Sequence, residues 1–392
     1  MRRTSLRLLF LFLIFTVSFA LYSPVCSGSE SHSVSYQLLD KPNGSTYYTL
    51  NVTIQQSLYD YYAEKSHNVY SVSDFAKFVT PYALQPIADS LWKVYTDEED
   101  FVNGALMIVH QIPYKETAPA KYPVETIIED TGDCDLFSYI AASIIKAGGF
   151  DVLLLYYESA SHMNIAVHLS NIPNDARGQA YSVTYNGDQY YMAECTNVRD
   201  WQTSWRVGEC PTDLENVPVQ MITLENCEQW APGQVSASFA ALEASSISLD
   251  ISPTYLVQAS TVTISGQLSP SLQNKNVTIY CKVNNLPWKV LSTVVTNSNG
   301  QFTYVWTAEA AGVCSVRAGW SGSDIYTGAD SPVRTITILS LFFILLLIAV
   351  IALVCVGIGV LLWSRQSQRA VQEPQQPQPP EIPSYRRSSD NY

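Results

Sequence analysis

The sequence predicts an α+β domain, then an all-β sandwich, then one transmembrane helix. Residues 73–147 show apolar positions at helical spacings, and the apolar runs between 152 and 196 resemble strands. Short alternating strands fill residues 247–336. Because helices come first and the later strands must pair among themselves, we expect a helix packed on a mostly antiparallel sheet.

Residues 1–20 are expected to be a secretory signal peptide. Arg2 and Arg3 precede a short apolar run that ends at Ala20, and Ser18 and Ala20 occupy the −3 and −1 positions of a cleavage site. An uncleaved anchor helix is the alternative. Export would place the following residues in an oxidising compartment.

The predicted α+β domain covers residues 45–230. A strand at Tyr47–Ile54 opens it, and acidic residues from Asp97 to Asp100 are expected to begin a solvated helix rather than bind calcium. The strongest helix follows Cys134 and stops at Gly148. Further helices and strands are expected at Ser73–Phe78, Pro86–Tyr95, Val152–Tyr157, His162–Leu169 and Tyr190–Thr196.

The second half is predicted to hold a linker and a sandwich. Residues 231–246, rich in Ala and Ser, are expected to be the linker. Residues 247–337 have the length and strand pattern of an immunoglobulin-like β-sandwich. Cys281 and Cys314 both fall on expected strands, and a disulfide between them is expected.

Residues 338–363 form the expected transmembrane helix. No charged residue occurs between Arg334 and Arg365, so the run exceeds the roughly 20 residues a bilayer core requires. Arginines follow the span, which predicts a cytoplasmic tail at 364–392 and an extracellular body. The tail is rich in Pro and Gln and is expected to be disordered.

Composition excludes some partners. The net charge is −13, which argues against nucleic acid, because phosphate binding requires clustered Lys and Arg. No Walker, Rossmann or zinc-ligand spacing occurs, so no cofactor or metal is expected. Glycosylation sequons at Asn43, Asn51 and Asn276 are consistent with an exposed extracellular surface.

The chain has eight cysteines, and one of them lies within the expected span. Seven would face the oxidising side, and this odd number leaves one thiol without an intrachain partner. Cys134 is the candidate free thiol. How Cys26, Cys195, Cys210 and Cys227 pair is left open.

Three residues form a candidate catalytic group. Cys134 begins a helix, where backbone N–H groups and the helix dipole favour a thiolate. His162 begins a strand 28 positions later (162 − 134) and is a candidate base. Glu194 lies near the end of the next strand and is a candidate acid that orients the imidazole. A helix packed on two adjacent strands brings such residues together.

The motifs around these residues resemble those of the transglutaminase-like superfamily, especially its archaeal and bacterial extracellular branch. The resemblance covers about residues 47–210. The matching segments are Gly132-Asp133-Cys134-Asp135, His162-Met163-Asn164-Ile165-Ala166-Val167, Tyr190-Tyr191-Met192-Ala193-Glu194-Cys195-Thr196 and Trp205-Arg206-Val207-Gly208-Glu209. One departure is Cys195, where the family has a small or Thr-like residue; its side chain is expected to point away from Glu194.

The resemblance implies a papain-like cysteine-enzyme core that acts on peptide or protein amides at the cell surface. Cys134 would form a thioester, His162 would move the proton, and Glu194 would hold His162. The Cys134 backbone N–H is the implied oxyanion donor. Gln111 and Tyr114 are candidates for the second donor, and Trp201 and Trp205 for the walls of the cleft. Hydrolysis and transamidation stay open.

A non-enzymatic function is the alternative. The same fold would then serve as a catalytically idle surface module for binding or adhesion, carried on the sandwich.

Overall fold

The structure is a computed structural model that describes residues 31–196 and 203–370. It divides into two compact units, one ending at Ile338 and the other beginning at Leu339. The expected signal peptide, Cys26, Trp201 and residues 371–392 of the expected tail lie outside the described residues.

A five-stranded antiparallel sheet forms the centre of the first unit. Its strand order is β5-β6-β4-β3-β7. The strands are β3 (Val152–Tyr157), β4 (His162–His168), β5 (Ser182–Tyr185), β6 (Asp188–Ala193) and β7 (Gln220–Thr223). The sequence predicted β3, β4 and β6. It missed β5 and β7, which have only four residues each and little buried surface.

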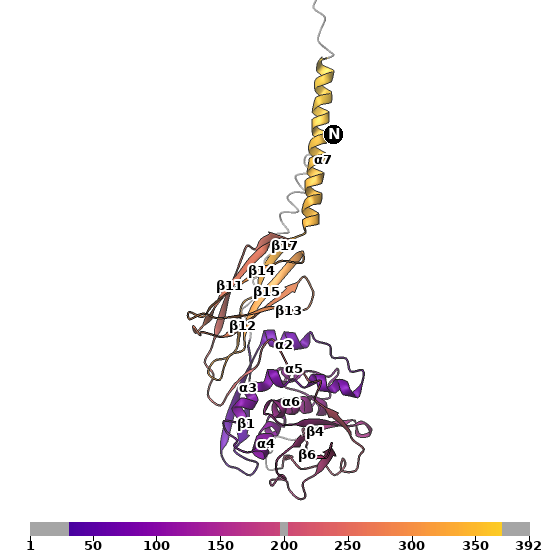
Figure 1. The fold of residues 1–392 in the computed structure, drawn as a ribbon, viewed down its shortest axis with the longest axis vertical. Helices are drawn as coiled ribbons and strands as arrows, with labels where there is room; N and C mark the ends of the chain where they lie inside the picture. The colour runs from indigo at the N-terminus through magenta and orange to yellow at the C-terminus, as the bar shows by residue number, and fades with distance from the viewer. Residues whose placement is uncertain (1–30, 197–202, 371–392) are drawn as a thin grey trace, which may run out of the picture. The chain divides into compact units, whose positions relative to one another are not determined.

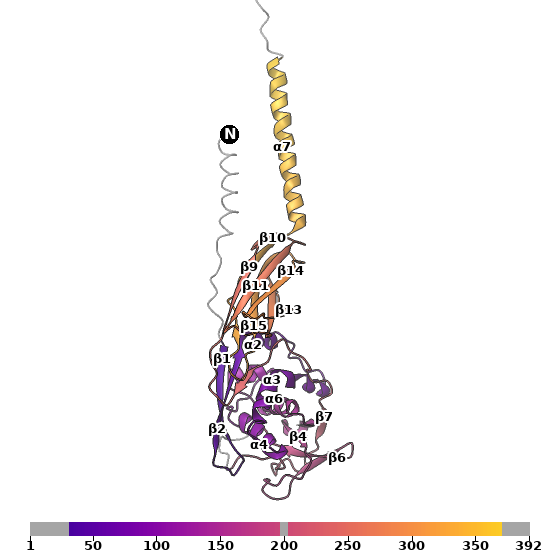
Figure 2. The same ribbon diagram turned by 60° about the vertical axis from the view of Figure 1, so that its left-hand side comes forward.

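The helix α6 (Cys134–Ala147) packs on this sheet against β3 and β4, as Figures 1 and 2 show. Ten consecutive residues of α6, from Leu136 to Ile145, are buried. The helix lies between the sheet on one side and α3 and α4 on the other, and this explains why it is buried around most of its circumference.

The remaining helical segments complete a common core with α6. They are α2 (Gln56–Ala63), η1 (Val72–Phe78), α3 (Pro81–Leu91), α4 (Glu98–Val109) and α5 (Pro123–Glu129), whereas the single turn η2 (Glu158–Ala160) has no buried residue. Asp97 caps α4, because its carboxylate accepts a hydrogen bond from the N–H of Asp100 at 2.9 Å. The acidic run is therefore a helix start, as predicted.

A second sheet corrects the predicted domain limits. It has the order β1-β2-β8, formed by β1 (Ser31–Leu39), β2 (Tyr47–Gln55) and β8 (Ser236–Ser238). The expected linker 231–246 thus contains a buried strand, and the domain begins before residue 45. The Ala and Ser side chains of β8 are small, and such residues occur both in linkers and in tightly packed strands. Composition alone therefore did not distinguish a linker from a strand here.

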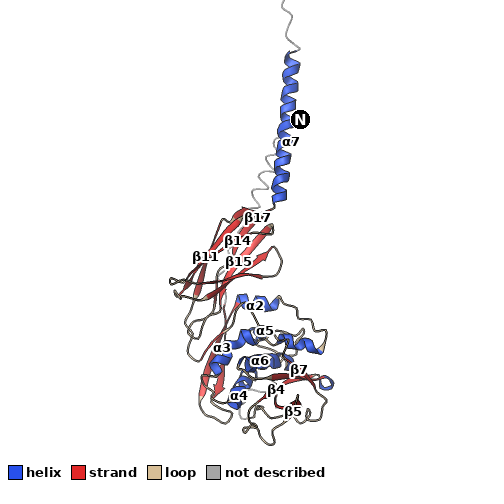
Figure 3. Cartoon of the chain, in the orientation of Figure 1, coloured by secondary structure: helices blue, strands red, loops and turns tan. Residues whose placement is uncertain are grey.

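The predicted sandwich is present as two sheets around one apolar core, and its strands are drawn in red in Figure 3. One sheet has the order β14-β11-β9 and the other β10-β17-β15-β12-β13, with β16 paired to β15. The strands are β9 (Ser246–Ser252), β10 (Tyr255–Val257), β11 (Thr261–Ser269), β12 (Asn276–Val283), β13 (Lys289–Val295), β14 (Gln301–Thr307), β15 (Gly312–Trp320), β16 (Ala329–Asp330) and β17 (Arg334–Leu339).

The expected Cys281–Cys314 disulfide is absent, and both residues are free thiols. They lie on the neighbouring strands β12 and β15 of one sheet, where Cys281 faces Val316 and Cys314 faces Val283. Such diagonal positions are about 7–8 Å apart, beyond the usual Cα separation of a disulfide. The Cys314 Sγ instead donates to the backbone carbonyl oxygen of Ser315 at 3.7 Å.

Polar contacts join the sandwich directly to the α+β part within the first unit. Asp60 of α2 accepts a hydrogen bond from Arg317 of β15 at 2.6 Å, and the Arg317 guanidinium lies over the Trp288 ring. The buried Asp330 accepts the N–H of Ser57 at 2.7 Å. The two parts therefore contact each other and are not separated by a free linker.

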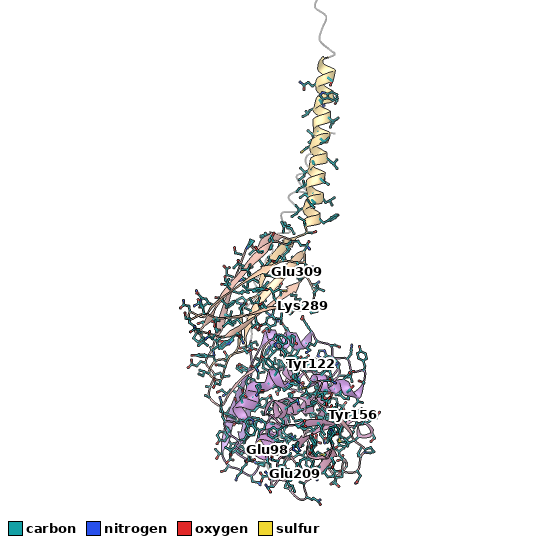
Figure 4. The ribbon with its side chains drawn as sticks, viewed as in Figure 1. Glu98, Tyr122, Tyr156, Glu209, Lys289 and Glu309 are labelled. Atoms are coloured by element: carbon teal, nitrogen blue, oxygen red, sulfur yellow. The ribbon has the colours of Figure 1, made fainter. Side chains whose placement is uncertain are left out.

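The second unit consists of α7 (Leu341–Ala370). The segment Leu341–Ser367 is long and apolar enough to cross a membrane. None of its most apolar stretch is buried against the rest of the protein, and Figure 4 shows its side chains pointing outward from the helix. The prediction began this helix at 338 and ended it at 363. Ile338 instead belongs to β17 and is buried in the sandwich core, whereas the helix continues to residue 370.

Candidate active site

Cys134 is the first residue of α6. The chain reaches it through Asp130 in the left-handed region (φ 51°) and then Gly132, whose hydrogen occupies a space with no room for a side chain. A Cβ on Gly132 would lie 2.9 Å from the Phe137 ring. This close approach packs the segment before Cys134 against the first turn of α6 and against Thr126 of α5.

His162 opens β4 and lies beside Cys134. The preceding Ser161 adopts a left-handed conformation (φ 48°) after η2, and its carbonyl oxygen lies 4.0 Å from the Cys134 Sγ. The imidazole Nε2 is 2.9 Å from Glu194 Oε2. The Cys134 side chain lies close enough to the ring to help raise the pKa of His162, and Nδ1 is the ring nitrogen not engaged by Glu194.

Glu194 follows the last residue of β6. The β4–β6 register pairs Ile165 with Ala193, so its continuation puts Glu194 opposite Asn164 and on the same face as His162. The structure thus brings together all three residues of the predicted catalytic group.

The Glu194 carboxylate is buried and fully hydrogen-bonded. Oε2 accepts from His162 and from Asn164 Nδ2 (3.2 Å), and Oε1 accepts from the Thr196 N–H (2.8 Å) and hydroxyl (2.5 Å). The side chain is 1% exposed. A buried carboxylate with this many donors is held in its charged form and in one orientation.

The pKa values of this pair favour charge on both partners. Burial alone would disfavour the imidazolium, but hydrogen bonds with Cys134 and Glu194 and the charges of both raise the pKa of His162 to about 10. Burial would likewise raise the pKa of Glu194, yet hydrogen bonds from His162 and Thr196 hold it below its usual range. His162 is therefore an imidazolium at neutral pH.

These shifts predict a pH-dependent contribution to stability. The raised pKa of His162 stabilises the fold fully below its ordinary value of 6.5, and this effect is lost as the pH rises through about 10. The lowered pKa of Glu194 stabilises it above 4.5, and this effect is lost as the pH falls further. Both contributions are complete between about pH 4.5 and 6.5.

Thermal unfolding of the His162→Ala variant checks this. Its Tm is expected to lie several degrees below that of the wild type near pH 5.5, with the difference shrinking toward pH 10. His168→Ala, which removes an imidazole from the far end of β4, is the control. A His162→Ala deficit that stays constant across this range would contradict the assigned charges.

Of the two candidates for a second oxyanion donor, one lies near Cys134 and one does not. Tyr114 is exposed, packs edge-on against Phe137 and interacts electrostatically with Cys134. Gln111 instead hydrogen-bonds to the backbone of Gln37, through both its amide nitrogen and its oxygen. Tyr114 is the better placed of the two.

Other predicted residues have structural positions. Asp133 precedes α6, but its carboxylate accepts the N–H of Thr117 at 2.7 Å and does not cap the helix. Trp205 lines a separate cavity of about 530 Å³ together with Tyr181 and Cys210. Cys195, Cys210 and Cys227, whose pairing was left open, are all free thiols.

The sequence analysis did not identify Asn164 and Thr196 as hydrogen-bond donors to the Glu194 carboxylate. Each lies two positions from a predicted catalytic residue, and side chains two apart on an extended chain share a face. That spacing was the available signal. Within residues 31–196 and 203–370, no group of three or more His, Cys, Asp or Glu side chains is arranged to hold a metal.

Comparisons with known proteins add little to this geometry. No family model matches the sequence, and no curated protein matches it. Solved structures similar to parts of the chain include a chitin-binding domain from Burkholderia pseudomallei, with 10% identity and a TM-score of 0.19. That match covers 21% of this chain and 55% of the domain.

Two further matches have the same low level of similarity. The PKD domain of an M14-like peptidase from a Thermoplasmatales archaeon shares 15% identity, covering 25% of this chain and 99% of that one, with a TM-score of 0.18. The D0-D1 domain of Intimin shares 15% identity over 45% of this chain and 89% of that one, with a TM-score of 0.19. At these TM-scores the likenesses support no functional argument.

Proposed function

We propose that this protein is a thiol enzyme of transglutaminase-like type that acts on carboxamide bonds of peptides or proteins. One observation carries the proposal. A half-buried cysteine at a helix N-terminus lies beside an imidazole, and that imidazole is held by a buried carboxylate that accepts four hydrogen bonds. Nucleophile, base and orienting acid in this arrangement constitute the machinery of acyl transfer.

The first half of the reaction forms a thioester. The Cys134 thiolate attacks the carboxamide carbon, and the C=O electrons move onto the oxygen. The His162 imidazolium then gives its proton to the departing nitrogen as the C–N bond breaks, releasing ammonia or an amine. Glu194 keeps the imidazole in place and stabilises its positive charge throughout.

In the second half, water or an amine resolves the thioester. Neutral His162 takes a proton from the incoming nucleophile, the C–S bond breaks, and the thiolate–imidazolium pair is restored. A carboxylic acid is released with water, and a new amide with an amine. Both reactions share every residue of the site.

The transient oxyanion requires donors beside the sulfur. The N–H of Cys134 lies in the first turn of α6, where amide groups have no acceptor within the helix. The Tyr114 phenol, exposed near Cys134, is proposed as the second donor. Together they would bind the oxygen from two sides.

The proposed setting is the outer face of a membrane. The apolar α7 would be a single-pass anchor, with the arginine-containing tail in the cytoplasm and the catalytic part outside. The targets would then be proteins or peptides at the surface of the same cell.

Alkylation by iodoacetamide tests the proposal without a known substrate. Mass spectrometry of the full-length chain at pH 6.5 is expected to show Cys134 modified at least about tenfold faster than Cys210. Cys210 is a control within the same chain, because burial and the nearby Glu215 carboxylate raise its pKa to about 12.

The His162→Ala variant completes this test, and it is expected to remove the rate advantage of Cys134. If Cys134 reacts no faster than Cys210 and His162→Ala changes nothing, the site is idle. The protein would then be better described as a surface binding module.

A further inference from the structure

A second histidine, His110, lies directly behind the candidate active site. It follows the last residue of α4 and is 2% exposed. Its Nε2 is 2.9 Å from the backbone carbonyl oxygen of Glu194, and its Nδ1 is 2.6 Å from the hydroxyl of Ser204. His110 thus connects α4, the residue after β6 and Ser204.

The chemistry of these contacts fixes the tautomer of His110. A carbonyl oxygen only accepts hydrogen bonds, so Nε2 must carry the proton and donate it to Glu194. Nδ1 is then an acceptor, and the Ser204 hydroxyl donates to it. Burial lowers the pKa of His110 to about 4, against the opposing effect of its bond to Glu194, so the ring is neutral at physiological pH.

The hydrogen bond from His110 holds a part of Glu194 that lies outside the paired strands. The β4–β6 ladder ends at the Ile165–Ala193 pair, so the backbone of Glu194 lies beyond the last paired residue. Its side chain is held on one side by His162, Asn164 and Thr196. His110 holds its backbone carbonyl, which the sheet does not.

We propose that His110 is a positioning residue, which fixes the Glu194 backbone so that the carboxylate stays within hydrogen-bonding distance of His162. This inference rests on the proposed function, because it assigns His110 a role in supporting the proposed catalytic group. The hydrogen bond to the Glu194 carbonyl is the contact through which His110 would act on the catalytic group. A loss of this support would weaken the imidazolium and, with it, the thiolate.

Three variants of the full-length chain separate positioning from packing. His110→Leu keeps an apolar side chain of moderate size and removes both hydrogen bonds. His110→Gln retains a donor able to reach the Glu194 carbonyl. Ser204→Ala removes only the outer hydroxyl, and it keeps the proposal testable if His110→Leu fails to fold. His67→Leu is the matched control, because His67 is a half-buried histidine paired with Glu125 outside the site.

The readout is the rate of Cys134 alkylation by iodoacetamide as a function of pH. His110→Leu is expected to lower the rate at pH 6.5 about tenfold and to move the half-maximal rate to higher pH. His110→Gln should stay within about threefold of the wild type, and Ser204→Ala should lose about two- to threefold. His67→Leu should keep the wild-type profile.

The inference is overturned if His110→Leu keeps the wild-type dependence of the alkylation rate on pH. It is also overturned if His110→Gln lowers this rate as much as His110→Leu does, because the loss would then come from packing and not from the hydrogen bond. If His110→Leu does not fold, an unchanged profile in Ser204→Ala overturns it. His162→Ala separates this failure from that of the proposed function. If His162→Ala slows Cys134 alkylation but His110→Leu does not, only the positioning role of His110 is refuted. If His162→Ala does not slow it either, both the positioning role and the proposed function are refuted.

Discussion

Full-length protein carrying Cys134→Ala is expected to turn over carboxamides about 10⁴-fold more slowly than the wild type, with only a residual rate left. The reason is that no other thiol among the described residues lies beside the His162–Glu194 pair with an open approach: Cys195 is fully buried. The assay is incubation with a glutamine-containing protein and a labelled primary amine. Ammonia or peptide fragments report hydrolysis, and bound label reports transamidation.

The double variant Cys134→Ala/His162→Ala is the control for cooperation between the two residues. Residues that act as one unit give strongly non-additive losses, so the double variant is expected to be no slower than Cys134→Ala alone. Turnover retained by Cys134→Ala would place the chemistry elsewhere and refute the proposed function.

Glu194→Gln is expected to lower kcat/KM by about 10³-fold while leaving the fold intact, by comparison with orienting acids in known triads. Gln has nearly the same shape, but it replaces the charge that helps raise the pKa of His162 to about 10. The imidazolium then loses its proton at a lower pH. The active pH range should therefore narrow from its alkaline side, which a pH–rate profile measures.

Glu209→Gln is the matched control for this variant. Glu209, labelled in Figure 4, is also a buried carboxylate, and it pairs with Arg177 at 2.7 Å. Its substitution is expected to lower the Tm without narrowing the pH profile. If Glu194→Gln and Glu209→Gln have the same effect on the profile, Glu194 has no special role in the chemistry.

The predictable parts of this molecule are those with strong local patterns. The buried helix after Cys134 and the strands at 152–157 and 162–168 have strong apolar patterns that tertiary contacts did not override. The candidate catalytic residues were predictable because each lies at the end of such an element. Their motifs also resemble those of a known superfamily.

The unpredicted parts depend on contacts between distant residues. The strand at 236–238 has only three residues, and its identity as a strand comes from pairing with β2. His110 showed no signal, because its role depends on a carbonyl 84 positions away. The expected Cys281–Cys314 disulfide was wrong because of the strand register. The sequence indicates that both residues lie on strands, but it does not show which residues face each other across those strands.

The pairing of β8 with β2 also sets an order of events during synthesis. Asn51 and Ser238 are 187 positions apart, yet they are neighbours in one sheet. A chain emerging from a ribosome or an export channel cannot complete this sheet until residue 238 has appeared. Until then the β2 edge lacks this partner, so the nascent chain would benefit from a chaperone, and a shortened chain ending near residue 230 would never bury that edge.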